Sequence, residues 1–314
     1  MRIVLAGGGR LGASLLRPLL DSSHEVVAVV QDGRKTRGGK RRWWPWVARF
    51  LGGRYSMPGW AKRLGLPILW LDKMDEGELA PLAALAPDLL LVGGFGIILK
   101  KAVLELPRIG CVNAHSSLLP RHRGPNPFAA VVMAGDTHSG VSFHRIDEGI
   151  DTGDILDQTA FEVGARDTLF TVYARACTLA GERVVAVMDR IAQEGLEGRP
   201  QDPDMATYEK KPLIEDARIL WDQPAIRIDR MVRALAPSPM PWFVFRGRRI
   251  RVSHTEFDPS PVEAAPGTVL RNRPGVTVAT QEGSISLTVA LTSSPLPWLW
   301  PNPLSRPRVG EWLE

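Results

Sequence analysis

The chain has 314 residues, 44% of them hydrophobic, and a formal net charge of +5. No stretch approaches the roughly 18 consecutive apolar residues of a membrane-spanning helix, which excludes that class of protein. The two cysteines, Cys111 and Cys177, are too few for a disulfide framework or a cysteine zinc site. The positive charge is compatible with a polyanionic partner such as RNA, and equally with ordinary variation in surface charge.

The chain opens with a short apolar run that ends in glycines, residues 2–9. The run lacks the long apolar region and the cleavage site of a secretion signal, so we interpret it as a first strand. Together with the low cysteine content, this favours a reducing cytoplasm. The length exceeds the roughly 250–300 residues at which a single core stops growing, which predicts about two domains.

Apolar, strand-like runs alternate with helical segments over the first two thirds of the chain. This alternation predicts an α/β domain with a Rossmann-like parallel sheet that helices cover on both faces. Residues 33–63 are interpreted as a long loop, because Pro45, Gly52 and Gly53 interrupt any long helix there. The expected strands are residues 2–6, 25–30, 88–92 and 110–114, and the expected helices include residues 76–86 and 168–194.

The character of the sequence changes after residue 194. A polar, proline-containing stretch at 195–212 is typical of a linker, and a short helix is expected at 224–235. Short β-rich runs separated by Gly, Pro and Asn follow, which predicts a small β-barrel or sandwich. The predicted organisation is a first domain at 1–194, a linker at 195–212 and a second domain at 213–314.

Three glycines after the first predicted strand raise the possibility of a dinucleotide site. Gly7, Gly9 and Gly12 satisfy the pattern G-x-G-x-x-G, and Asp32 follows where a ribose-binding acid would lie. An NAD(P) oxidoreductase is therefore one alternative. The other interpretation is that the tight first turn of such a sheet requires glycines for steric reasons.

An amide, an imidazole and a carboxylate lie in the segment 110–154 among turn-forming residues. Asn113 and His115 lie two positions apart next to a predicted strand end, so their side chains share one face. Such donors stabilise the negative charge that forms on a carbonyl oxygen when an amine attacks it. Asp151 would orient His115 and raise its pKa if the intervening chain folds back. Taken alone, an Asn before a turn is usually a cap, a lone His is usually structural or at the surface, and an Asp in a Gly-rich loop usually belongs to a turn. Other histidines, at positions 122, 138 and 144, are interpreted as surface residues.

The ordered pattern around these three residues resembles the signature of the folate-dependent formyltransferases. The resemblance runs through Asn113-Ala-His115-Ser-Ser117-Leu-Leu-Pro120, Arg123-Gly124, Gly135-Asp136, Ser139-Gly140-Val141 and Gly149-Ile-Asp151-Thr-Gly153. Enzymes of this family move a formyl group from 10-formyltetrahydrofolate to a primary amine. The resemblance implies that Asn113 and protonated His115 stabilise the tetrahedral oxyanion. It implies that Asp151 orients His115 and, through water, helps to remove the amine proton, with no metal.

The resemblance also implies where the folate donor binds. The segment after the strand at 88–92 resembles the family's pterin pocket, with a phenylalanine where a tyrosine is usual. The implied donor-binding residues are Phe95, Gly96, Ile97, Ile98, Leu99, Ser117, Leu118, Leu119, Pro120, Asp147 and Gly149.

The second half of the chain resembles the methionyl-tRNA formyltransferases within this family. The matching stretches are Thr207-Tyr208-Glu-Lys210, Arg233-Ala-Leu-Ala-Pro237, Arg248-Arg249-Ile250-Arg251-Val252 and Pro266-Gly267-Thr268. This resemblance implies an OB-like β-barrel in the second domain and initiator methionyl-tRNA as the acceptor.

The segment 33–63 holds ten Lys or Arg residues and four of the ten tryptophans. In the methionyl-tRNA formyltransferases a basic loop at this place enters the acceptor-stem groove, and Arg37-Gly38 resembles its Arg-Gly element. Two other interpretations are a solvated loop whose tryptophans pack on the domain, and a shallow membrane-surface segment. The implied acceptor-binding residues are Arg37, Arg41, Arg42, Arg121, Arg123, Gly124 and Asn126.

One departure bears on the acceptor. Where the tRNA-specific enzymes usually have a pair of small residues, this chain has Pro125-Asn126-Pro127, which resembles formyltransferases that act on sugar nucleotides. The alternatives are therefore an amino-sugar nucleotide or other small amine as acceptor, and a non-catalytic RNA-binding relative. Retention of Asn113, His115 and Asp151 argues against the non-catalytic alternative. The sequence gives no indication of the oligomeric state.

Overall fold

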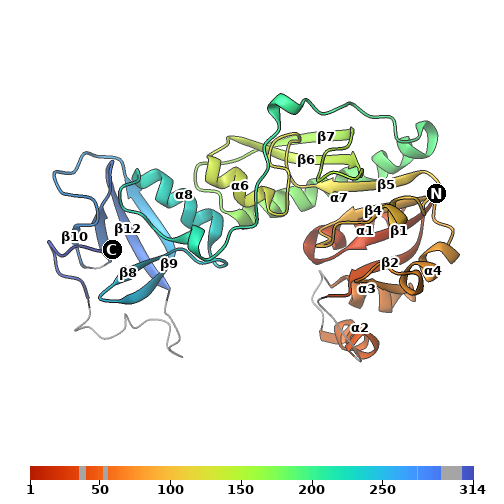
Figure 1. The fold of residues 1–314 in the computed structure, drawn as a ribbon, viewed down its shortest axis with the longest axis horizontal. Helices are drawn as coiled ribbons and strands as arrows, with labels where there is room; N and C mark the ends of the chain where they lie inside the picture. Colours follow the sequence, from red (N-terminus) through yellow and green to blue (C-terminus); the bar gives the residue numbers. More distant parts are fainter. Residues whose placement is uncertain (35–39, 52–55, 274, 291–305) are drawn as a thin grey trace. The chain divides into compact units, whose positions relative to one another are not determined.

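A computed structural model describes residues 1–34, 40–51, 56–273, 275–290 and 306–314 (Figure 1). Arg37 and the proline- and tryptophan-rich run 295–303 lie outside the described residues. The chain divides into two compact units. The first comprises residues 1–127, 138–162 and 171–209, and the second comprises residues 128–137, 163–170 and 210–314.

The first unit is an α/β structure built on one sheet. Its strands are β1 (Arg2–Gly7), β2 (Glu25–Asp32), β3 (Ile68–Leu71), β4 (Leu89–Gly93), β5 (Gly110–His115), β6 (His138–Arg145) and β7 (Ile155–Glu162). Its helices are α1 (Gly9–Leu20), α2 (Lys40–Leu51), α3 (Met57–Leu64), α4 (Glu76–Ala84), α5 (Lys101–Leu104) and nearly all of α7 (Leu169–Glu194), with the 3-10 turn η1 (Pro203–Met205).

The seven described strands of this sheet have the order β3-β2-β1-β4-β5-β6-β7. Strands β1 to β5 pair in parallel, which confirms the predicted α/β class, whereas β6 and β7 pair antiparallel. The four strands expected from the sequence are β1, β2, β4 and β5, and all of them are parallel. The antiparallel strands β6 and β7 were not among the expected elements.

Alternate residues of β1 belong to two separate hydrophobic clusters, one on each face of the sheet. Ile3 and Leu5 pack in a cluster with α1, α3 and α7, and Val4 and Ala6 pack in a cluster with α4. Burial on both faces explains why the parallel strands read as continuous apolar runs rather than as alternating ones.

The expectation of a loop at 33–63 was wrong, because α2 and α3 form within it. Pro45 lies inside α2 and Pro58 in the first turn of α3. The two helices pack closely: a Cβ added to Gly59 would lie 2.4 Å from the Ala48 carbonyl oxygen. This packing overrides the low helix propensity of Pro45.

The second unit contains a five-stranded antiparallel sheet with the order β10-β11-β12-β9-β8 among the described residues. Its core includes Phe243, Ile250, Val278 and Ile285. This sheet confirms the predicted small β domain. Its elements are η2 (Glu215–Ala217), α8 (Ala225–Leu235), β8 (Trp242–Phe245), β9 (Arg248–Asp258), β10 (Val269–Arg271), β11 (Val276–Ala279), β12 (Ser284–Ala290) and most of α6 (Pro127–Ala134).

No helix in the described ranges combines the length and the apolar character that crossing a bilayer requires.

Candidate active site

The carboxyl end of β5 carries Asn113 and His115 on the same face of the strand. His115 is 6% exposed, and its ring is enclosed by the chain segment that follows the strand. The Nε2 atom of His115 lies 2.9 Å from the carbonyl oxygen of His122, so Nε2 carries the hydrogen of this bond. The imidazole is therefore held in one orientation by backbone, with Nδ1 directed elsewhere.

The loop between β6 and β7 brings Asp151 to β5. The loop is closed at its base, where Arg145 N donates to Asp154 O at 2.9 Å. Gly153 permits this closure, since a Cβ there would lie 2.1 Å from the Arg145 carbonyl oxygen. Asp151 itself adopts a left-handed backbone with a φ of 55°. The predicted folding-back of this segment is thus what the structure shows.

The carboxylate of Asp151 lies among the predicted partners. Its Oδ1 accepts a hydrogen bond from Asn113 Nδ2 at 3.3 Å, and its Oδ2 accepts one from Gly124 N at 2.9 Å. Oδ2 also lies 3.6 Å from His115 Nδ1. The structure therefore brings the three residues of the predicted catalytic set into one cluster, with the carboxylate between the amide and the imidazole.

A second imidazole completes this cluster. His144 of β6 pairs with Asn113 in the sheet register, and it is 2% exposed rather than at the surface, so that expectation was wrong. Its Nδ1 donates to Arg145 O at 2.8 Å. Its Nε2 lies 3.1 Å from Asn113 Nδ2 and 3.4 Å from Asp151 Oδ1. Nε2 can therefore accept a hydrogen from Asn113, or donate one to Asp151 once protonated.

His122 is also buried, at 4% exposure, contrary to the expectation of a surface position. Its backbone N donates to Thr207 Oγ1 at 2.8 Å, and its Nδ1 lies 3.4 Å from Glu209 Oε1. These contacts fix the carbonyl group that accepts from His115. His138, at the start of β6, is exposed as expected.

The pKa values of the cluster follow from burial and from its shared charge. Burial is the largest cause acting on His115 and lowers its pKa, and it outweighs the opposing effect of Asp151. The expectation of a raised pKa for His115 was wrong for this reason. Burial also raises the pKa of Asp151, but the hydrogen bond from His144, the two imidazoles and Gly124 N–H together hold it well below its usual range. A neutral His115 beside an ionised Asp151 is the resulting state at neutral pH.

The predicted donor segment 95–99 lies next to this cluster by topology. It follows β4, which pairs in parallel with β5, so both strands end at the same edge of the sheet. Phe95 and Ile97 are partly buried against the core, Leu99 is buried and Ile98 is largely exposed. The guanidinium of Arg34 donates to the carbonyl oxygen of Gly96, which holds the segment toward β2.

The residues of the motif after His115 mostly organise the backbone. Ser117 Oγ donates to Arg121 O at 2.8 Å, and Leu119 N donates to Ser142 Oγ at 3.1 Å. The Leu119–Pro120 peptide bond is cis. Leu118 packs on Gly140, where a Cβ would lie 2.4 Å from its Cδ2. These contacts shape the chain around the cluster.

Asp147 organises the loop that carries Asp151. Its Oδ1 accepts hydrogen bonds from Gly149 N at 3.0 Å and from Thr152 Oγ1 at 2.7 Å. A Cβ on Gly149 would lie 2.0 Å from that hydroxyl oxygen, so the position requires glycine.

The predicted acceptor-binding residues have different surroundings. Arg123 donates to Gln201 Oε1 at 2.8 and 3.1 Å, and Gln201 Nε2 in turn donates to the carbonyl oxygens of Asp151 and Gly153. Arg123 therefore braces the Asp151 loop. Arg121 is exposed, and Arg41 and Arg42 lie on α2.

Asn126 lies one residue before α6 and two after Gly124. Its Oδ1 is shielded from solvent, with no hydrogen-bond partner among the described residues. Gly124 has a φ of 110°, and a Cβ there would lie 2.4 Å from Glu209 O. Glycine at 124 therefore allows the chain to pass closely against Glu209.

The glycines after β1 have a packing explanation. A Cβ on Gly7 would lie 2.2 Å from Gly93 O, and one on Gly12 would crowd Met57. Asp32, the candidate ribose-binding acid, is held in two hydrogen bonds by the Arg34 side chain at 2.9 and 3.1 Å. The arrangement therefore does not favour the dinucleotide alternative.

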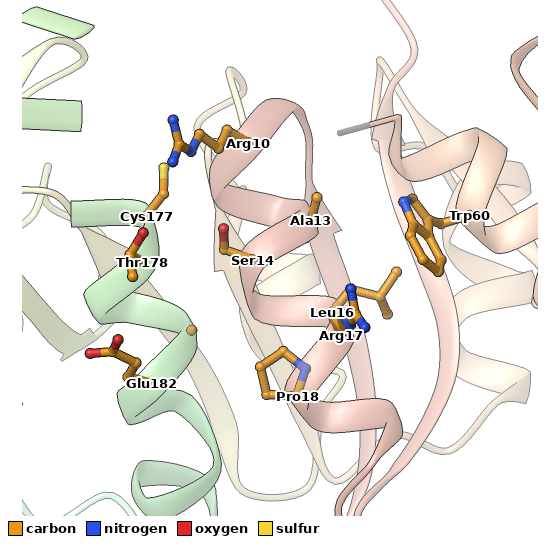
Figure 2. A pocket seen from close by; sticks show the side chains of 11 residues that line it. Arg10, Ala13, Ser14, Leu16, Arg17, Pro18, Trp60, Cys177, Thr178 and Glu182 are labelled. Carbon is orange, nitrogen blue, oxygen red and sulfur yellow. The ribbon is translucent and has the colours of Figure 1, made fainter. Parts of the chain in front are cut away.

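A cavity of about 580 Å³ lies elsewhere in the first unit, between α1 and α7 (Figure 2). Figure 2 shows Arg10 and Ser14 of α1 on the side of Cys177 and Thr178 of α7. Leu16 and Arg17 lie on the other side of α1, toward Trp60. The lining of the cavity includes neither the Asp151 cluster nor the donor segment. Within the described ranges, no His, Cys, Asp or Glu residues form a group of three or more that could hold a metal ion.

Two family models match this chain. The model described as formyl transferase matches residues 1–188, and the model described as formyl transferase, C-terminal domain, matches residues 214–293. A methionyl-tRNA formyltransferase from Pseudomonas putida (strain W619) is 36% identical over 289 residues, which cover 92% of this chain and 90% of that relative.

Solved structures share the fold at lower identity. The N-formyltransferase from Helicobacter canadensis, in complex with folinic acid and dTDP-3-aminofucose, has a TM-score of 0.67 at 17% identity and covers 92% of this chain and 99% of that one. The methionyl-tRNA formyltransferase from Clostridium thermocellum has a TM-score of 0.54 at 16% identity, with coverage of 90% and 100%. With the family models covering both units, these findings show that the chain belongs to the formyl transferase family and is a formyltransferase.

Proposed function

We propose that this formyltransferase takes its formyl group from 10-formyltetrahydrofolate and transfers it to the amino group of initiator methionyl-tRNA, in the cytoplasm. The observation that carries the proposal is the cluster of Asn113, His115 and Asp151 at the carboxyl end of β5. The acceptor is inferred from relatives such as the Pseudomonas putida enzyme, whose name states that acceptor.

The residues at the sheet edge fit a folate donor. A flat aromatic ring with hydrogen-bonding edges requires an apolar slot beside backbone donors and acceptors. Phe95, Ile97 and Leu99 supply apolar surface, and the carbonyl and N–H groups of the same segment supply polar edges. When bound, this donor supplies an activated formyl group attached to nitrogen.

Asn113 and His115 are placed to stabilise charge on the formyl oxygen. As the acceptor amine attacks the formyl carbon, that oxygen becomes negative and needs hydrogen-bond donors in a site shielded from water. Asn113 offers an Nδ2 hydrogen. Neutral His115 has its only ring hydrogen on Nε2, where it is donated to the His122 carbonyl oxygen, so His115 can donate to the formyl oxygen only by exchanging that partner. The lowered pKa of His115 means that a neutral imidazole N–H, rather than an imidazolium, is the donor in the resting enzyme.

Asp151 and His144 are placed to receive the proton that the amine loses. Ionised Asp151 stabilises positive charge on either imidazole, and His144 Nε2 can take the proton and hold it in a hydrogen bond to Asp151 Oδ1. In balance, a bond forms between the amine nitrogen and the formyl carbon, and the bond from that carbon to the donor nitrogen breaks. One proton passes from the amine to the leaving nitrogen.

The test is to incubate the purified enzyme with 10-formyltetrahydrofolate and methionyl-tRNA and to identify the product by mass. Formyl-methionyl-tRNA is the expected product, and His115→Ala is expected to lower its rate by about 10²–10⁴-fold. Full activity in that variant would contradict the mechanism. Absence of product from wild-type enzyme would contradict the acceptor.

A small amine is the second candidate acceptor, and Asn126 is the observation that favours it. Its Oδ1 is shielded from solvent without a partner in the described part of the chain, so a bound ligand amine or hydroxyl would satisfy it. The same incubation with a panel of amino-sugar nucleotides tests this candidate. A formylated sugar nucleotide, with methionyl-tRNA unchanged, would favour it over the tRNA acceptor.

We also propose boundaries for the functional parts of the chain. We assign the formyltransferase domain to residues 1–194, the linker to 195–212 and the OB-like domain to 213–314.

Binding of the acceptor stem by the basic segment at 33–63 would complement phosphate charge. The charge reversals Arg41→Glu and Arg42→Glu are expected to raise KM for methionyl-tRNA more than they lower kcat.

A further inference from the structure

The carbonyl group that accepts from His115 belongs to a residue with an unusual backbone. His122 has a φ of 58°, in the left-handed region that is unfavourable for a residue with a Cβ. Its side chain is nevertheless buried, so the conformation is part of the packed structure. Such a backbone persists only where the surrounding contacts hold it. The contacts that hold His122 therefore bear on the orientation of His115.

Those contacts come from Thr207–Glu209, a short segment much further along the chain. Thr207 Oγ1 accepts a hydrogen bond from His122 N at 2.8 Å, and Thr207 O accepts one from Arg123 N at 2.9 Å. Glu209 N donates to Arg123 O at 2.8 Å. Thr207 thus binds the backbone N–H groups of two consecutive residues, one with its hydroxyl and one with its carbonyl group.

One peptide group connects this segment to the imidazole of His115. The carbonyl oxygen of this group, from His122, accepts the Nε2 hydrogen of His115 at 2.9 Å. The N–H of the same group, from Arg123, donates to Thr207 O. The two ends of a peptide plane point in opposite directions, so the three groups form one chain of hydrogen bonds. Each bond in such a chain polarises the next, which couples Thr207 to the imidazole.

The same segment also packs against the residue that donates to Asp151. A Cβ on Gly124 would lie 2.4 Å from Glu209 O, so the two backbones are in close contact. Gly124 N donates to Asp151 Oδ2 at 2.9 Å. Residues 122–124 therefore supply backbone partners to both the imidazole and the carboxylate of the cluster, and Thr207–Glu209 supports this stretch from the other side.

We propose that Thr207 is a positioning residue for His115 and acts through the backbone of His122. The inference rests on the proposed catalytic role of His115. Thr207 is exposed, and its hydroxyl bonds to backbone rather than to a member of the cluster. With the His122 carbonyl held in place, Nε2 is the nitrogen of His115 that carries the hydrogen, and Nδ1 faces Asp151 at 3.6 Å.

The charged and titratable groups around His115 give this role a measurable signature. They are Asp151, His144 and His122, with Glu209 3.4 Å beyond the His122 ring. Burial lowers the pKa of His115 most, Asp151 and the bond to the His122 carbonyl raise it, and the two other imidazoles lower it. A weaker bond to that carbonyl is therefore expected to lower the pKa of His115 further.

The test compares Thr207→Val, which removes the hydroxyl but keeps the branched shape, with Thr207→Ser, which keeps the hydroxyl. The valine variant is expected to lower kcat about 3–10-fold, the effect of losing one hydrogen bond, with little change in KM for 10-formyltetrahydrofolate. The serine variant is expected to retain most of the rate. The matched control is Thr178→Val, an exposed position on α7 where the hydroxyl donates to Ala174 O. Melting curves check that each variant is folded.

Nitrogen-15 NMR of labelled histidines measures the His115 ring without turnover. The signal is assigned by its absence in His115→Asn. Thr207→Val is expected to lower the pKa of His115 by about 0.5 and to add the second neutral tautomer, with the hydrogen on Nδ1. The acid limb of the kcat profile is expected to move to lower pH by the same amount. Thr207→Ser and Thr178→Val are expected to match the wild-type enzyme.

Three outcomes would overturn the proposal. The first is a wild-type kcat, pKa and tautomer in Thr207→Val. The second is an equal loss in Thr207→Ser, which would assign the effect to packing rather than to the hydroxyl. The third is a higher kcat in Thr207→Val, which would mean that the carbonyl restrains His115 instead of positioning it. Failure of the proposed function is distinct, since it would appear as full activity in His115→Ala while the NMR comparison still reports on Thr207.

Discussion

Two imidazoles share one carboxylate in this site, and that arrangement decides what each residue can do. Asp151 lies 3.6 Å from His115 Nδ1 and 3.4 Å from His144 Nε2, so the two imidazoles share a single carboxylate partner. His115 is held by a backbone carbonyl and keeps a fixed donor. His144 can change partner between Asn113 and Asp151, which makes it the positioning residue that couples the amide to the carboxylate.

Replacement of His144 tests this coupling. His144→Ala is expected to lower kcat about 10–100-fold, the effect of losing a hydrogen bond to a charged group, with a smaller change in KM. The pH profile of kcat is expected to shift as well, since one of two interacting groups is lost. His138→Ala on the same strand, where the side chain is exposed, is the control. Equal rates in both variants would remove His144 from the mechanism.

The lowered pKa of His115 predicts how stability and kcat change at acidic pH. Burial lowers this pKa from its ordinary value of 6.5, so the unfolded chain binds a proton at higher pH than the folded chain does. Stability is therefore expected to fall as the pH drops below 6.5, and kcat is expected to decline at still lower pH, where folded His115 becomes protonated. Chemical denaturation from pH 8 to pH 5 measures the first effect. If His115→Asn left the dependence of the unfolding free energy on pH unchanged, His115 would not be the group responsible for it.

At the level of elements, the site depends on a loop closed at its base between β6 and β7. Gly153→Ala would place a Cβ 2.1 Å from Arg145 O and push Asp151 away from His115. We expect the free energy of unfolding to fall by about 1–3 kcal/mol. We also expect kcat to fall by a larger factor than the factor by which KM changes. The control is Gly77→Ala, where the nearest atom is a side-chain oxygen at 3.5 Å. Retention of full kcat in Gly153→Ala would show that loop closure is not required.

The second unit has its own buried charge. Asp229, fully buried, accepts hydrogen bonds from Arg233 Nε at 2.7 Å and Thr255 Oγ1 at 2.9 Å, and lies 3.3 Å from Arg166. Asp229→Ala leaves buried Arg233 without its carboxylate and is expected to cost about 3–5 kcal/mol. Urea unfolding measures this loss of unfolding free energy, and Asp222→Ala, at an exposed position, is the control. A loss below 1 kcal/mol would contradict this role.

Sequence patterns identified the elements with strong periodicity and missed those whose form depends on tertiary contacts. The strands of the parallel sheet were predictable because burial on both faces gives continuous apolar runs. Helix α2 was not predictable, because its packing against α3 at Gly59 outweighs the low helix propensity of Pro45. Asn113 and His115 were visible from their spacing, whereas His144 required knowing that β6 pairs antiparallel beside β5. The polar alternation of Ser142 and His144 was the available signal.

At the scale of the whole molecule, charge is distributed unevenly. All of the net positive charge comes from residues 33–63, while the rest of the chain has an excess of acidic residues. A polyanionic acceptor such as tRNA would therefore be attracted mainly by one segment. A small amine would gain nothing from that segment unless its binding site lay there.

Salt dependence distinguishes these acceptors. Each phosphate contact releases counterions, so kcat/KM for methionyl-tRNA is expected to fall steeply as salt rises from about 50 to 200 mM, whereas that for a small amine changes little. Replacing Lys40, Arg41 and Arg42 by Gln removes three of ten charges in the segment and is expected to flatten this slope. Replacement of three surface residues outside it, Lys73, Lys100 and Lys101, is the control. An equal slope in the two triple variants would mean that the basic segment does not steer the acceptor.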